Sequence, residues 1–172
     1  MHDTIKTITL YFLSMNEKLP CQVLQKLIYL VDYFYARQHG KQYTAIKWYY
    51  DKSGPYSQEV EIAITDNSSV SIQRQGDHPS IGSYFIYPGA LPIIQYEDLL
   101  IVLQHIQRLY AESHGYNDFT LYVYSTSPLR KTQQNRYIDI LAAVKEEADE
   151  LLEETWEETV KVYGEVLTAL AE

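Results

Sequence analysis

Residues that could carry out chemistry are few and dispersed in this 172-residue chain. His105 and His114 lie nine residues apart, which is not a recognised spacing for two ligands of one metal ion. The single cysteine, Cys21, could act as a nucleophile only with a base beside it, and the sequence places none nearby. We therefore expect Cys21 to be a buried structural thiol. We expect all five histidines to be ordinary core or surface residues.

The short motifs of common enzyme classes are also missing. The chain contains no G-x-S-x-G elbow, Walker loop, G-x-G-x-x-G, H-E-x-x-H or C-x-x-C. Paired carboxylates are plentiful only on the predicted C-terminal helix, where solvated glutamates are the ordinary state. We expect no catalytic residue, no metal and no cofactor. An enzyme with an unfamiliar motif stays as a third alternative, which a deep pocket with convergent polar groups would favour.

The net charge of −9 is concentrated at one end of the chain. Residues 1–137 hold twelve acidic and twelve basic side chains, whereas residues 138–172 hold eleven acidic side chains and only two lysines. A neutral body without a basic stripe cannot neutralise a row of phosphates. We therefore expect no direct binding of nucleic acid.

The compartment follows from three observations. One cysteine cannot form an intramolecular disulfide, which favours a reducing environment. The first residues lack the basic region, apolar core and cleavage site of a signal peptide. No apolar run approaches the roughly 20 residues that cross a bilayer. We expect a cytoplasmic protein without a membrane partner.

Apolar residues at helical spacing predict four helices that would position these side chains. The predicted helices cover residues 4–16, 23–39, 58–64 and 96–113. Pro20 is expected at the first position of the second helix, and Gly40 at its end. Ser57 is expected to cap the third helix, and Gly115 to end the fourth.

Strand signals are short. Residues 46–50 form an aromatic run that ends in a predicted turn, Ser53-Gly54-Pro55. Residues 68–89 predict a β-hairpin around the turn-rich stretch 76–82. Residues 119–124 alternate like a strand but follow two good helix caps, so periodicity leaves both structures open. Pro128 is expected to end this segment in either case.

The longest predicted element is an acidic helix from about Gln133 to Leu170, which contains no proline and only Gly164 as glycine. Its apolar stripe includes Leu152, Trp156 and Val160, while glutamates occupy the other faces. Such a helix spans roughly 50 Å, whereas the body should measure about 30–35 Å. The excess length predicts contact with a partner or a second copy, unless the helix folds back near Gly164. We lean towards a basic partner, because the glutamates of two copies would repel each other.

Together these elements predict a mainly helical α+β fold. A compact helical domain with a small β-hairpin would cover residues 1–131. The acidic amphipathic C-terminal helix would cover residues 132–172.

One pattern is more specific than the rest. The stretch Lys26-Leu27-Ile28-Tyr29-Leu30-Val31-Asp32-Tyr33 fits K-L-x-Y-x-x-D-Y, and a W-Y-x-x-x-x-G-P pattern begins at Trp48. Tyr124-Ser125-Thr126-Ser127-Pro128 follows far downstream. In this order the pattern resembles the Panacea domain, also called the SocA-like antitoxin domain and often described as a phage-associated GepA-like protein. The resemblance covers about residues 13–129 and leaves the acidic helix outside.

The resemblance implies an antitoxin that neutralises a cognate toxin by direct contact within a toxin–antitoxin pair. One relative is described as an adaptor that delivers its toxin to a protease. The chain lacks the appended helix-turn-helix of some members, so operator binding is not expected. The alternative function is that of a phage-associated regulatory or proteolytic adaptor with a non-toxin partner. In either case the expected partner is a protein.

The motif residues and one exposed aromatic are the candidate partner-binding residues. On the second predicted helix, Tyr29, Asp32 and Tyr33 share a face, and Asp32 could accept a hydrogen bond from a tyrosine, Lys47 or the Gly54-Pro55 backbone. The alternative is that these residues only fix the fold. We expect Tyr33, Tyr49 and Tyr56 to be exposed, which makes them better interface candidates than the buried ones. The candidates are Tyr29, Asp32, Tyr33, Trp48, Tyr49, Gly54, Pro55, Tyr56 and Trp156.

Overall fold

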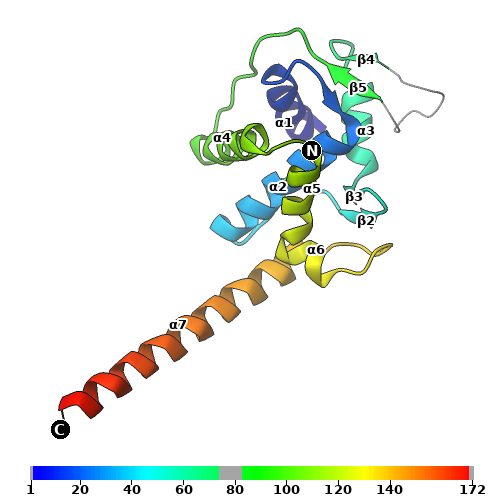
Figure 1. The fold of residues 1–172 in the computed structure, drawn as a ribbon. Coiled ribbons are helices and arrows are strands. Elements are labelled where there is room, and N and C mark those ends of the chain that lie inside the picture. Colours follow the sequence, from blue (N-terminus) through cyan, green and yellow to red (C-terminus); the bar gives the residue numbers. More distant parts are fainter. Residues whose placement is uncertain (1, 74–82, 171–172) are drawn as a thin grey trace.

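The computed structural model describes residues 2–73 and 83–170, and over these residues it contains seven helices and five short strands. The body is built around α2 (Cys21–His39), which α1 (His2–Ser14), α4 (Glu97–Glu112) and α5 (Tyr116–Ser125) contact (Figure 1). α3 (Gln58–Thr65) packs on α1. The mainly helical α+β fold predicted from the sequence is confirmed.

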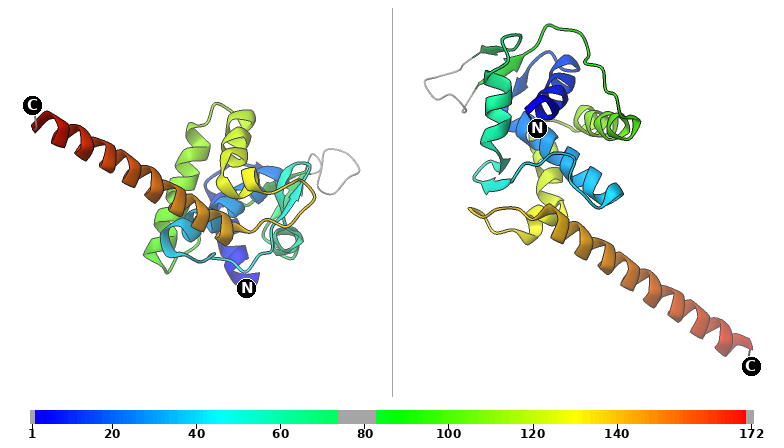
Figure 2. Two further views of the ribbon diagram at one scale, coloured as in Figure 1. Left: turned by 90° about the horizontal axis from the view of Figure 1, so that it is seen from below. Right: turned by 180° about the vertical axis from the view of Figure 1, so that it is seen from behind.

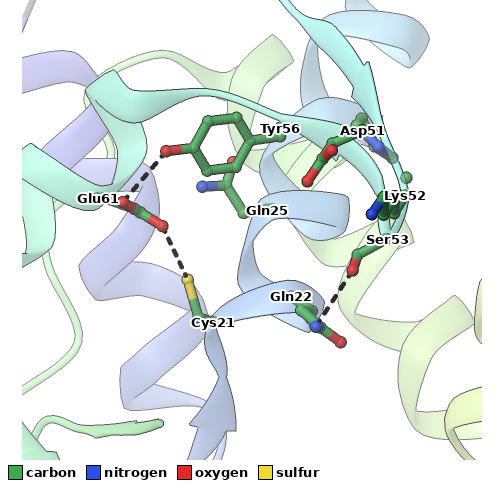
Figure 3. Close-up of a pocket in the computed structure, with 10 residues that line it drawn as sticks. Cys21, Gln22, Gln25, Asp51, Lys52, Ser53, Tyr56 and Glu61 are labelled. Atoms are coloured by element: carbon green, nitrogen blue, oxygen red, sulfur yellow. Dashed lines mark hydrogen bonds between the residues drawn. The ribbon is translucent and has the colours of Figure 1, made fainter. Parts of the chain in front are cut away.

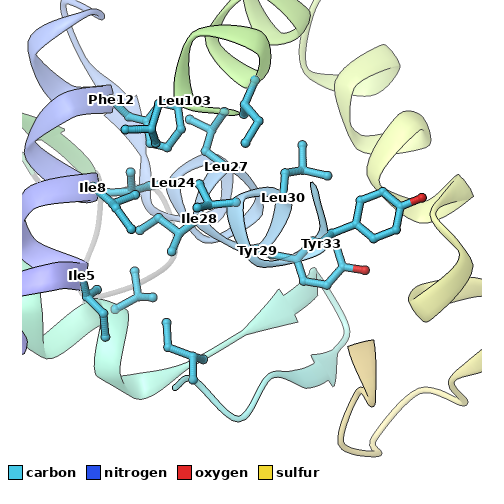
Figure 4. Close-up of a cluster of buried hydrophobic side chains, with 14 of the residues drawn as sticks. Ile5, Ile8, Phe12, Leu24, Leu27, Ile28, Tyr29, Leu30, Tyr33 and Leu103 are labelled. Carbon is cyan, nitrogen blue, oxygen red and sulfur yellow. The ribbon is translucent and has the colours of Figure 1, made fainter. Parts of the chain in front are cut away.

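The helix α2 is the centre of the hydrophobic core. Every residue from Val23 to Ala36 is buried, as expected of a helix enclosed on all sides. Aliphatic side chains from α1 and α4 pack around its first turns, Ile8 and Leu103 among them (Figure 4). Gly40 ends α2 in the left-handed conformation, at φ 67°, as the sequence predicts. Pro20 lies just before α2 rather than at its first position.

Two small antiparallel sheets flank the helices. β1 (Leu19–Pro20), β5 (Tyr84–Ile86) and β4 (Ser71–Gln73) form the first, which confirms the predicted hairpin over its described residues. The predicted turn at 76–82 lies outside the described residues. β2 (Tyr49–Asp51) and β3 (Gly54–Tyr56) form the second sheet. The expectation that Gly54 and Pro55 form the turn is therefore wrong, because they belong to β3 and the turn is Lys52-Ser53.

The segment that periodicity left open is the helix α5. Phe119 and Val123, one turn apart, are buried, whereas the alternating residues are not consistently so. Pro128 does not end this helix, which stops at Ser125; the proline lies instead in the first turn of α6 (Ser127–Lys131), where its missing N–H costs nothing. Likewise α4 ends before Ser113, and Gly115, at φ 109°, immediately precedes α5.

The acidic C-terminal helix, α7 (Ile140–Leu170), begins later than expected. The preceding residues pair with β2: the Tyr50 N–H donates to the Arg136 carbonyl at 2.8 Å, and Asn135 N–H donates to the Tyr50 carbonyl at 2.7 Å. Beyond this segment α7 extends away from the body in every view (Figure 2). It therefore overhangs, as its length predicts, and does not fold back. No helix within the described ranges has the length and apolar character needed to cross a bilayer.

Candidate partner-binding site

The motif carboxylate Asp32 is fully buried on α2 and accepts four hydrogen bonds. The donors are the Thr44 N–H at 2.7 Å, the Thr44 hydroxyl, Trp48 Nε1 at 2.8 Å and Gln42 Nε2 at 3.2 Å. None of the three partners expected from the sequence is among them. Burial raises the pKa of Asp32, and these four hydrogen bonds counteract the rise. Asp32 thus fixes the chain between α2 and β2 and does not reach the surface.

Two motif tyrosines on α2 are also buried. The Tyr29 hydroxyl and Thr126 Oγ1 are 2.9 Å apart, and its ring meets Trp48 edge to face at 5.7 Å. Tyr33 is only 4% exposed, so the expectation that it is exposed is wrong. Both hydroxyls point away from the aliphatic cluster (Figure 4). The structure therefore brings Tyr29, Asp32, Tyr33 and Trp48 together, but inside the fold.

The reason for the burial of Tyr33 is the first part of α7. Glu147 accepts hydrogen bonds from the Tyr33 hydroxyl at 3.3 Å and from Ser127 Oγ at 2.7 Å, and pairs with Arg37 at 3.4 Å. We call the contacts of Glu147 with Tyr33, Ser127 and Arg37 the α7 clamp. Next to the clamp, Lys131 forms ion pairs with Glu146 and Glu150 of α7. No sequence pattern indicates this clamp, because Glu147 resembles every other glutamate of a solvated helix.

The β2–β3 hairpin is fastened to α2 by a buried lysine. Lys26 is 1% exposed, and its Nζ donates to the Ser53 carbonyl and, at 3.5 Å, to the Tyr116 hydroxyl. Burial lowers the pKa of Lys26 to about 8. Gly54 adopts φ 108°, and a Cβ there would lie 3.2 Å from the Tyr124 ring. Gly54 and Lys26 therefore hold the hairpin close to the helices.

A pocket of about 210 Å³ lies between this hairpin, the start of α2 and α3 (Figure 3). Glu61 accepts from the Tyr56 hydroxyl at 3.2 Å and from Cys21 Sγ at 3.9 Å. Burial, together with the charge of Glu61, raises the pKa of Cys21 to about 12. The thiol therefore stays protonated and is a poor nucleophile. Within the described ranges, no group of three or more metal-binding side chains occurs. Cys21 therefore does not supply this pocket with a reactive thiolate.

The outer side of the same hairpin carries two aromatic rings next to Tyr137. Tyr49 and Tyr137 meet edge to face at 5.5 Å, and with Tyr56 they line a shallow hollow beside Lys47 and Glu59. Tyr137 is 71% exposed, whereas Tyr49 and Tyr56 are half-buried and thus less exposed than expected. We call Tyr49, Tyr56 and Tyr137 the tyrosine platform. Exposed tyrosines are enriched at protein interfaces, where they supply large, rigid contact area. Sequence reasoning missed Tyr137, whose place in the platform depends on pairing with β2.

A second exposed surface follows α7 beyond the clamp. Leu151, Leu152, Trp156 and Val160 are between 52% and 70% exposed. We call these four residues the α7 stripe. Trp156 is thus placed far from the buried motif residues, on a surface that a partner can reach.

Comparison with known proteins gives one match. The family model described as antitoxin SocA-like, Panacea domain matches residues 24–171. The match includes α7, so the expectation that the acidic helix lies outside the shared domain is wrong. No curated protein and no solved structure matches the chain. The division into residues 1–131 and 132–172 stays a prediction.

Proposed function

Because the chain belongs to the antitoxin SocA-like, Panacea domain family, we propose that it is an antitoxin-type protein-binding module that neutralises a cognate toxin by direct contact. It would do so in the cytoplasm, as one half of a toxin–antitoxin pair, and without catalysis. Family membership supports the antitoxin type of role. The observation that supports direct contact is the tyrosine platform, a partly exposed aromatic surface formed by the β2–β3 hairpin and Tyr137.

The buried motif residues support the platform from behind. Trp48 directly precedes Tyr49, and its indole is held by Asp32 at 2.8 Å. Ile138, next to Tyr137, donates its N–H to the Trp48 carbonyl at 2.8 Å. Two of the platform tyrosines therefore have neighbours fixed to the core, so a partner would meet rings with little freedom left to lose. On this proposal the motif serves binding indirectly, by positioning the platform.

The test is co-expression of this chain with the reading frame adjacent to its gene. We expect the adjacent product to arrest growth when expressed alone, the present chain to restore growth, and the two proteins to purify together. The double variant Tyr49→Ala/Tyr137→Ala should weaken both rescue and co-purification at least about tenfold, as loss of interface tyrosines typically does. The control is Tyr96→Ala, which removes a tyrosine that is 61% exposed before α4.

Two outcomes would contradict the proposal. A product that is harmless alone but still co-purifies would favour an adaptor with a non-toxin partner. Full rescue by the platform variant, with Tyr96→Ala equally active, would mean that the platform is not the contact surface. A specific gel shift by the purified chain with its own promoter, at low salt where electrostatic binding is strongest, would overturn the expectation that it does not bind DNA alone.

A further inference from the structure

The part of α7 beyond the clamp projects into solvent with its apolar stripe uncovered. Residues 148–170 extend about 33 Å at 1.5 Å per residue. Leu152 and Trp156 lie one turn apart, at 69% and 70% exposure, and Val160 continues the line. A row of this kind left in water is an aggregation liability, so an uncovered stripe indicates a binding surface.

From this surface we infer that the α7 stripe binds a basic protein partner, in an apolar groove with a rim that carries lysine or arginine. This inference deepens the proposed function and rests on it in taking that partner to be the toxin. The apolar part of the recognition would centre on Trp156, because tryptophans that insert into a partner's pocket commonly dominate binding energy.

The charge of the helix identifies the chemistry of the partner. Residues 145–161 contain eight acidic side chains and two lysines. Three of the acids, Glu146, Glu147 and Glu150, already pair with Lys131 or Arg37 of the body. The other five have no ion pair within the part of the chain that the structure describes: Asp149, Glu153, Glu154, Glu157 and Glu158.

Helical geometry places three of these carboxylates along one side of the line Leu152-Trp156-Val160. At 100° per residue, Asp149, Glu153 and Glu157 lie about 20°, 60° and 100° from Trp156 on that side, whereas Glu154 and Glu158 lie near the opposite face of the helix. A groove that accepts the stripe would therefore bring one of its rims against carboxylates. A basic rim would be attracted, and more strongly at low ionic strength.

A second copy of this chain fits the same surface poorly. Pairing two α7 helices through their stripes would bring the two rows of unpaired carboxylates together, with only Lys145 and Lys161 from each copy to offset them. Like charges at this spacing repel and oppose self-association. A homodimer through α7 is therefore an outcome that the test must separate from the inference.

Trp156 provides the readout. The chain has two tryptophans, and Trp48 is 1% exposed whereas Trp156 is 70% exposed. The purified full chain is titrated with a lysine-rich amphipathic helical peptide that has leucines on its apolar face, and separately with the same peptide carrying glutamates for lysines. We expect a blue shift of tryptophan emission with the lysine peptide only, weakening at least about tenfold as salt is raised to physiological strength and above.

Two variants and two controls separate shape from charge. The variant Leu152→Ser/Trp156→Tyr replaces two of the four stripe residues, and the variant Glu153→Gln/Glu154→Gln/Glu157→Gln/Glu158→Gln removes four charges. Each variant should weaken peptide binding about tenfold or more. Binding to the first variant, which lacks Trp156, is measured by the anisotropy of a labelled peptide. Ile101→Ser exchanges an apolar residue of α4 that is 55% exposed. Glu17→Gln/Asp66→Asn/Glu97→Gln/Glu112→Gln removes four charges from the body. Both controls should bind like the wild type.

The outcomes are distinct from those of the toxin test. Equal binding of both peptides, no blue shift, or unchanged affinity of the stripe variant would overturn the inference even if an adjacent toxin is neutralised. A dimeric mass for the chain alone, with Trp156 emission already blue-shifted, would overturn it in favour of a second copy. Conversely, peptide binding could depend on both the carboxylates and the stripe although no adjacent gene encodes a toxin. That result would support binding of a basic partner by the α7 stripe and contradict the proposed antitoxin function.

Discussion

The helices α2 and α7 both carry aromatic and acidic side chains, but in opposite surroundings. α2, whose only acidic residue is Asp32, is enclosed from Val23 to Ala36, whereas the glutamate-rich α7 is exposed from Ala148 onward over its described side chains. Together, the buried polar side chains of α2 are hydrogen-bonded to residues from several parts of the chain, as burial requires. On α7 only the residues of the first turns are held. A residue type therefore indicates architecture or recognition only once its surroundings are known.

Removing the carboxylate of Asp32 should have the largest effect. In Asp32→Ala the donors on Thr44, Trp48 and Gln42 lose their acceptor inside the core, at a cost of about 3–5 kcal/mol of unfolding free energy. Urea denaturation, monitored by the fluorescence of Trp48, would measure this loss of unfolding free energy. The matched substitution Asp66→Asn, at an exposed site, should change stability by less than about 0.5 kcal/mol. Equal midpoints for the two variants would show that the network does not stabilise the fold.

Gly54→Ala should cause the second-largest loss of stability. The backbone at this position has a φ of 108°, which strains any other residue, and the added Cβ would lie 3.2 Å from Tyr124. We therefore expect the unfolding free energy, measured by thermal or urea denaturation, to fall by about 1–3 kcal/mol. Gly40→Ala has a positive φ of 67° but nothing within 4 Å, and should cost about 1 kcal/mol. Pro55→Ala should likewise affect folding more than binding. Variants at 54 and 55 that melt normally but lose the partner would identify the hairpin edge as a contact surface.

The buried ammonium of Lys26 predicts an effect of pH. The folded protein releases the Lys26 proton near pH 8, whereas the unfolded chain keeps it to about 10.5, so the unfolded state binds more protons between these values. Stability should therefore rise with pH through this window, by on the order of 1–2 kcal/mol, relative to the variant Lys26→Met. Parallel urea titrations of both proteins at pH 7, 8, 9 and 10 would measure the difference. A constant difference across the series would mean that Lys26 is not desolvated.

Truncation of α7 should have the smallest effect on stability. It should also locate the boundary between the part of α7 that is held by the body and the part that extends into solvent. A chain ending at Glu150 keeps Glu147 and both ion pairs of Lys131, and should unfold within about 0.5 kcal/mol of the full chain. A chain ending at Lys145 loses the clamp and should lose roughly 1–2 kcal/mol. If both truncations melt like the full chain, the clamp contributes nothing. If the chain ending at Glu150 melts clearly below the full chain, the outer helix contacts the body.

The sequence was sufficient for elements specified by neighbouring residues. The end of α2 at Gly40, the Ser57 cap of α3, whose hydroxyl accepts from the Glu59 N–H at 3.1 Å, and the β4–β5 pairing all depend on residues close in the chain. The predictions that the structure contradicts concern contacts between residues that are distant in the chain. Tyr33 looked exposed because nothing near it in sequence reveals Glu147.

The hairpin shows the same limit. Gly54-Pro55 has turn composition, but the chain turns at Lys52-Ser53, and Gly54 instead lies in β3 beside the side chains of Lys26 and Tyr124. The lysine is part of the recognised motif, although its burial could not be predicted without the location of Ser53. The candidate binding residues were therefore chosen partly from the family pattern and partly from expected exposure, and neither criterion indicated Tyr137 of the platform or Glu147 of the clamp.

The α7 clamp also has a consequence for the order of folding. Asp32 joins residues 10 to 16 positions away, whereas Tyr33 and Glu147 are 114 positions apart. Closing the longer loop costs about 2 kcal/mol more in chain entropy, so the clamp should form after the Asp32 network. During synthesis, the core that supports the tyrosine platform can thus form before α7 docks. The α7 stripe, which we assign to the basic partner, is then the last surface to reach its final position.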